Sequence, residues 1–160
     1  MTRFNLFFLT LFNTGKFKYA PGTIASFFTC VIFLILNNYL SIFNLFFLTL
    51  IIFIYSIYAI NISYQSYDTS DPQEIVMDEF IGQMIPLLAI PVYETLFPTE
   101  KIYYCIASFV VFRFFDILKP FPINYIDKNT KGAFGIMLDD IVAGFFSAFL
   151  LTLLFFYLGG

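Results

Sequence analysis

The chain alternates between long apolar runs and short polar segments, and this pattern predicts its elements. A first apolar run, 3–12, is too short to cross a hydrocarbon layer of about 30 Å and is typical of an interfacial helix. Five later runs predict short membrane helices: Ile24–Leu36, Ile42–Ile60, Phe80–Phe97, Ile102–Leu118 and Ile141–Leu158. Pro86 and Pro91 are expected to kink the third of these. We therefore predict an all-α integral membrane protein, with four or five short membrane helices in a single domain over residues 1–160.

Composition also favours a membrane protein. Hydrophobic residues make up 60% of the 160 residues and charged residues only 12%, whereas soluble domains are roughly half apolar and about a quarter charged. A soluble domain with an extreme bias toward Phe, Ile and Leu is the alternative. The net charge of −3 gives no nucleic-acid footprint. The sequence has no histidine, which excludes His-ligated zinc and Ser-His-Asp triads.

The basic residues predict an orientation in the membrane. If five helices cross and the N-terminus is cytoplasmic, every Lys and Arg except Lys101 falls on the cytoplasmic side, as the positive-inside rule requires. The same topology brings three polar segments to one face: 13–26, 71–79 and 113–140. We therefore expect a site among polar loops on the cytoplasmic face.

The densest acidic segment is 71–82. On a helix, Asp71, Glu74 and Asp78 would fall on one face. A carboxylate face at the mouth of an apolar segment is costly unless cations or water meet it. This segment is therefore the first candidate for a site.

Paired acids precede two of the apolar runs. Asp78 and Glu79 come before the third run, and Asp139 and Asp140 come before the last. Acids at a helix start can simply stabilise the helix dipole. Carboxylates packed this closely repel one another, however, and need a counter-charge. Because Mg²⁺ takes oxygen ligands and completes its shell with water and phosphate, we predict that these four residues bind Mg²⁺.

Basic residues near the same face are suited to bind phosphate. Arg113 and Lys119 flank Asp116 at helical spacing, although the arginine and the aspartate can also simply pair. Lys16 lies in a segment with Gly and Pro, and Thr23 is expected to cap the helix that follows. A basic surface loop would have the same composition. We predict that Arg113, Lys119, Lys16 and Thr23 bind the phosphate of a lipid head group.

Four blocks together resemble the phosphatidylglycerophosphatase A family: P-G-T-I-A-S at 21–26, D-P-Q-E-I-V-M-D-E-F-I-G at 71–82, R-F-F-D-I-L-K-P-F-P at 113–122 and G-A-F-G-I-M-L-D-D-I-V-A-G at 132–144. The blocks cover nearly the whole chain in the order and spacing of that family. Ala25 and Ala133 stand where the family more often has glycine, which reduces close backbone approach at those points.

This resemblance implies a fold, an activity and a location. It implies a multi-pass helical protein of the bacterial inner membrane with its active site on the cytoplasmic side. Its activity would be the Mg²⁺-dependent removal of the terminal phosphate from phosphatidylglycerophosphate, which gives phosphatidylglycerol. The polar residues that the resemblance implies are Asp71, Glu74, Asp78, Glu79, Arg113, Asp116, Lys119, Asp139 and Asp140.

The expected mechanism is a metal-assisted hydrolysis. Mg²⁺ would lower the pKa of an attacking water, Arg113 and Lys119 would stabilise charge on the phosphoryl group, and Asp116 would orient or deprotonate the water. The predicted catalytic residues are therefore Asp78, Glu79, Asp116 and Asp140. An aspartyl-phosphate intermediate is the alternative, but the sequence has no D-x-D-x-T/V signature.

Two other functions fit parts of the pattern. Intramembrane acids and proline-broken helices suit a small cation transporter or channel, but the acids lie at one side of the membrane rather than near its middle. A CDP-alcohol phosphotransferase would share the lipid chemistry, but its D-x-x-D-G-x-x-A-R pattern is absent. The expected partners are a phospholipid substrate and the membrane, and no nucleic acid.

Overall fold

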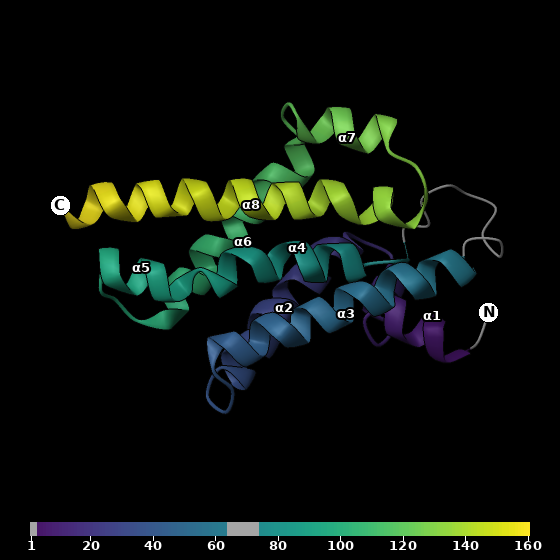
Figure 1. Ribbon diagram of the computed structural model, residues 1–160, viewed down its shortest axis with the longest axis horizontal. Helices are drawn as coiled ribbons and strands as arrows, with labels where there is room; N and C mark the ends of the chain where they lie inside the picture. The colour runs from purple at the N-terminus through teal and green to yellow at the C-terminus, as the bar shows by residue number, and fades with distance from the viewer. Residues whose placement is uncertain (1–2, 64–73) are drawn as a thin grey trace.

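Helices form the regular structure in the part of the chain that the computed structural model describes, residues 3–63 and 74–160. The elements, shown in Figure 1, are α1 (Arg3–Leu9), the 3-10 turn η1 (Thr14–Lys16), α2 (Pro21–Leu36), α3 (Ile42–Ser63), α4 (Met77–Leu88), α5 (Ile90–Leu96), α6 (Lys101–Leu118), α7 (Ile123–Asn129) and α8 (Gly132–Gly159). The all-α prediction is confirmed for these residues.

Helices α4 and α8 lie side by side at the centre of the molecule (Figure 1). Helix α8 also packs against α5, α6 and α7, and α4 packs against α2 and α3. Most of α4 is therefore buried, including its amide residue Gln83. This arrangement carries the first turn of α4, with its two acids, into the interior.

Two glycines allow the backbones of α4 and α8 to touch. A Cβ atom at Gly82 would lie 2.6 Å from the carbonyl oxygen of Asp140, and one at Gly144 would collide with the carbonyl oxygen of Gly82. Only residues without a side chain permit so close a crossing of two helices. The crossing sets Asp140 of α8 beside the first turns of α4.

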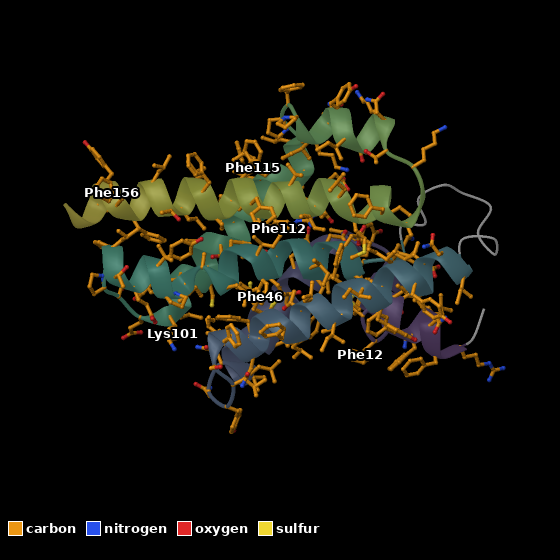
Figure 2. All side chains as sticks on the ribbon, viewed as in Figure 1. Phe12, Phe46, Lys101, Phe112, Phe115 and Phe156 are labelled. Carbon is orange, nitrogen blue, oxygen red and sulfur yellow. The ribbon has the colours of Figure 1, made fainter. Side chains whose placement is uncertain are left out.

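Two helices are long and apolar enough to cross a membrane, α3 over Ile42–Ile62 and α8. Only 28% of the most apolar window of each is buried within the protein, whereas the core helix of a soluble protein is mostly buried. Phe46 of α3 and Phe156 of α8, both labelled in Figure 2, are 50% and 67% exposed, whereas Phe112 is fully buried. Apolar surface of this extent is expected to face lipid, and the two helices are consistent with a membrane protein.

The third apolar run forms two helices instead of the single kinked helix predicted. Helix α4 has 12 residues and ends at Leu88, and α5 has 7 residues and carries Pro91 in its first turn. Proline lacks an N–H and its ring clashes with the preceding turn, so it is best tolerated at a helix start. Neither helix alone is long enough to cross a hydrocarbon layer.

Helix α8 begins at Gly132, not at Ile141 as predicted. Asp139 and Asp140 therefore lie inside the helix and not at its start, so the alternative that they only stabilise its N-terminal dipole does not hold. Apolar periodicity underestimated the length of the helix because its early turns carry polar groups that face a pocket. At about 1.5 Å per residue its 28 residues span about 42 Å, which exceeds a hydrocarbon layer of about 30 Å. The early turns can therefore extend beyond the lipid.

The helical face predicted for Asp71, Glu74 and Asp78 is also corrected. Helix α4 begins only at Met77, so Glu74 precedes it and does not share its face with Asp78. The backbone N–H of Val76 instead donates to the carbonyl oxygen of Leu9 at 3.1 Å, which fixes this segment against the end of α1. Asp71 lies outside the described residues.

The glycine crossing predicts that a single methyl group will separate α4 from α8. Gly82→Ala and Gly144→Ala should each lower the free energy of unfolding by about 1–3 kcal/mol, the usual cost of overpacking a core. Denaturant unfolding of the purified protein in detergent would measure the change. Gly160→Ala is the control, because a Cβ there would make an ordinary contact of 3.6 Å. Equal stability of all three variants would contradict the crossing.

Candidate active site

A polar pocket of about 670 Å³ lies where five elements meet. Its walls come from the starts of α2, α4 and α8, the end of α6, and the end of α7. The residues that line it are Ala20, Pro21, Gly22, Ile75, Asp78, Glu79, Arg113, Asp116, Lys119, Asp127, Lys128, Thr130, Lys131, Gly132, Gly135, Ile136, Asp139 and Asp140. The prediction that three polar segments far apart in sequence come together is therefore confirmed.

Three carboxylates converge in this pocket. Asp78, Glu79 and Asp140 each offer one oxygen atom, and these atoms all lie within 4.8 Å of one another. Oδ1 of Asp78 and Oε2 of Glu79 are buried without a hydrogen-bond partner in the described structure. Burial, and then the charge of Glu79, raises the pKa of Asp78 well above its usual range. Unpartnered carboxylate oxygens at this spacing fit a hard divalent cation.

The fourth predicted metal ligand, Asp139, is engaged differently. Its Oδ2 atom accepts a hydrogen bond from Nζ of Lys119 at 2.7 Å, and the same Nζ donates to Oδ1 of Asp127 at 2.6 Å. Burial alone would lower the pKa of Lys119, but the two carboxylates outweigh it and hold the pKa above its usual value. Lys119 thus ties the end of α6 to α7 and α8.

Arg113 and Asp116 form an ion pair one turn apart on α6, as their spacing predicted. Both side chains are largely buried, and Nη1 of Arg113 also donates to Oγ of Ser26 on α2 at 3.4 Å. Nε of Arg113 is buried without a partner among the described residues. Arg113 lines the pocket, and its guanidinium has hydrogen-bonding capacity that no described residue meets.

The start of α2 contributes backbone instead of the predicted side chains. Oε1 of Glu79 lies against Gly22, where a Cβ atom would collide with it. The helix begins at Pro21 after Ala20, so Thr23 lies in the first turn and the prediction that it caps the helix is wrong. Neither Thr23 nor the exposed Lys16 is among the pocket residues.

Sequence reasoning missed three charged side chains of the pocket: Asp127, Lys128 and Lys131. All three lie in the polar segment 113–140, which was expected to meet the other two polar segments. Sequence reasoning also missed Gln83, four residues beyond Glu79 on α4, which is 0% exposed and has no partner for either amide atom in the described structure. The available signal was an amide among the apolar residues that follow Glu79 on α4.

The fold and the pocket define a class: an all-helical protein with a largely apolar surface and a site suited to a phosphate ester and a divalent cation. The family model of phosphatidylglycerophosphatase A matches residues 7–155. The chain therefore belongs to the phosphatidylglycerophosphatase A family, and it is a phosphatase.

Three relatives illustrate this similarity. Phosphatidylglycerophosphatase A of Haemophilus influenzae is 35% identical over 85% of this chain and 79% of its own length. Phosphatidylglycerophosphatase A of Escherichia coli is 47% identical over 49% of this chain and 41% of its own length. A Bacteroides thetaiotaomicron protein named "Putative phosphatidylinositol-3-phosphatase" is 35% identical over 89% of this chain and 88% of its own length. No solved structure matches the chain.

The unpaired amide of Gln83 predicts an unusual effect on stability. A buried polar group without a partner costs about 1–3 kcal/mol, so Gln83→Leu should leave the free energy of unfolding unchanged or raise it. The matched control is Asn5→Leu, which removes a buried amide whose Oδ1 accepts a hydrogen bond from Tyr55 at 3.0 Å and should destabilise the protein. Denaturant unfolding compares the two variants. If Gln83→Leu lowered the free energy of unfolding as much as Asn5→Leu, the amide of Gln83 would have hydrogen-bond partners after all.

Proposed function

We propose that the protein is a Mg²⁺-dependent lipid phosphatase that hydrolyses phosphatidylglycerophosphate to phosphatidylglycerol and inorganic phosphate. The observation that carries the proposal is the convergence of Asp78, Glu79 and Asp140 in a pocket whose wall also presents Arg113. Membership of the family and the names of two relatives support the choice of substrate.

The metal ion would be held by Asp78, Glu79 and Asp140. Asp139 would act indirectly, by holding Lys119 in an ion pair beside them. A bound Mg²⁺ supplies positive charge beside the phosphoryl oxygens and lowers the pKa of a bound water. Because the ion also balances the repulsion among the three carboxylates, its affinity and their protonation are linked.

The cationic residues of α6 would bind the phosphoryl group. Arg113 has an unpartnered buried Nε atom for one phosphoryl oxygen, and the ion pair with Asp116 fixes its side chain. Lys119 would add charge, held in place by its two carboxylate partners. Lys16 and Thr23 stay predictions for phosphate binding, and their positions outside the pocket lining lend them no support.

Asp116 would orient the attacking water or accept its proton. Water then adds to phosphorus, the bond to the glycerol oxygen breaks, and that oxygen leaves with a proton. Asp116 suits this role because it lines the pocket on the same helix face as Arg113. An aspartyl-phosphate intermediate is the alternative route.

We also propose a multi-pass arrangement in the bacterial inner membrane, with four or five crossings and the pocket on the cytoplasmic side. The apolar exteriors of α3 and α8 and the distribution of basic residues support it. The transporter alternative is not favoured, because the chain belongs to a family of phosphatases. Phosphatidylinositol 3-phosphate is a second candidate substrate, since the name of the Bacteroides thetaiotaomicron relative refers to that lipid.

Phosphate release tests the proposed reaction and its metal. Purified protein in neutral detergent should release inorganic phosphate from phosphatidylglycerophosphate, lose this activity in EDTA and regain it when Mg²⁺ is restored. Phosphatidylinositol 3-phosphate is assayed in parallel. Faster turnover of the inositol lipid would move the assignment to that substrate, and full activity in EDTA would refute the metal requirement.

The carboxylate cluster predicts a specific loss of function. Asp78→Asn and Glu79→Gln each remove one negative ligand, so Mg²⁺-dependent turnover should fall by about 10²-fold or more while membrane insertion is unchanged. Glu94→Gln is the control, because Glu94 lies on α5 outside the pocket lining. Undiminished turnover in either cluster variant would remove that residue from the metal site.

A further inference from the structure

The charged groups of the pocket fall into paired and unpaired sets. Arg113 pairs with Asp116, and Lys119 pairs with Asp127 and Asp139. Three acids remain without a basic partner among the described residues, namely Asp78, Glu79 and Asp140, and these form the carboxylate cluster. Two pocket lysines also remain without an ion pair in that part of the chain, Lys128 and Lys131.

The two unpaired lysines lie at the rim of the pocket. Both are exposed, whereas Asp140 is buried and Asp78 is half-buried, with its Oδ1 atom enclosed. Lys128 lies in the last turn of α7, and Lys131 immediately precedes α8. The pocket therefore has a buried acidic region suited to a cation and a solvent-exposed basic region suited to an anion.

The rim is held in place by neighbouring contacts. Asp127, next to Lys128, forms an ion pair with Lys119 at 2.6 Å. Ile123, at the start of α7, is fully buried. The carbonyl of Thr130 approaches Gly135 so closely that a Cβ atom there would lie 2.5 Å from it. The turn between α7 and α8 is thus packed against α8, and the two lysines project from a fixed element.

We propose that Lys128 and Lys131 bind a second phosphate of the substrate, the one that is not hydrolysed, and so select lipids whose head group carries two phosphates. This inference rests on the proposed function. Phosphatidylglycerophosphate has a terminal monoester, which would lie at the buried carboxylates, and a phosphodiester beyond one glycerol unit. Two uncompensated lysines at the rim provide the charge that the phosphodiester needs.

The experiment compares two ligands of the same pocket. The double variant Lys128→Gln/Lys131→Gln is assayed in neutral detergent micelles that contain phosphatidylglycerophosphate at low mole fraction, so that the micelle surface carries little charge. KM and kcat are measured for this lipid, together with the inhibition constant of inorganic phosphate, which carries only the hydrolysed group. Lys101→Gln, at the opposite end of α6 from the pocket (Figure 2), is the matched control.

We expect KM for the lipid to rise about tenfold in the double variant, the effect of two exposed charge contacts. We expect kcat and the inhibition constant of phosphate to stay within about twofold, since neither depends on the second phosphate. The charge-conserving variant Lys128→Arg/Lys131→Arg should restore KM, which excludes misfolding as the cause.

Two outcomes would overturn the inference. An unchanged KM would show that the lysines do not contact substrate. A parallel rise in KM and in the inhibition constant of phosphate would assign them to the hydrolysed group instead. Failure of the proposed function is a separate result, because the unmodified protein would then release no phosphate from this lipid.

Discussion

The contact between the backbones of α4 and α8 is the constraint on which the site depends. Gly82 and Gly144 have no side chains to separate the two helices, and the carbonyl oxygens of Asp140 and Gly82 occupy the space that Cβ atoms would need. Because α4 carries Asp78 and α8 carries Asp140, this approach brings their carboxylate oxygens within 4.8 Å. A wider crossing would leave two separate acidic patches.

Burying these carboxylates is unfavourable without opposite charge, and the surroundings show how the cost is limited. Asp116 and Asp139 each have a basic partner, Arg113 and Lys119 respectively. Asp78, Glu79 and Asp140 have no basic partner among the described residues, which is the state expected of a site that gains its counter-charge from a ligand. Basic residues of the protein thus neutralise the acids at the wall of the pocket, whereas the three acids of the carboxylate cluster have no such partner among the described residues.

Much of the architecture was predictable because apolar periodicity reports helices directly. The bounds of α3 and α6 follow the apolar runs within a few residues, and the turn after α2 falls at Asn37 as expected. The errors occurred where polar chemistry interrupts a helix or extends it. Pro91 divided the third run, and the early turns of α8 were assigned to a loop because they contain Asp139 and Asp140.

The sequence by itself determined the helical class of the protein, most of the acids and bases that line the pocket and the family to which the chain belongs. These depend on residue identity and order. Only the tertiary structure decided that Asp139 pairs with Lys119 while Asp140 joins the cluster, and that Lys128 enters the pocket while Lys16 does not line it. The physical reason is that adjacent residues on a helix point about 100° apart, so helix packing alone determines which neighbour each one meets.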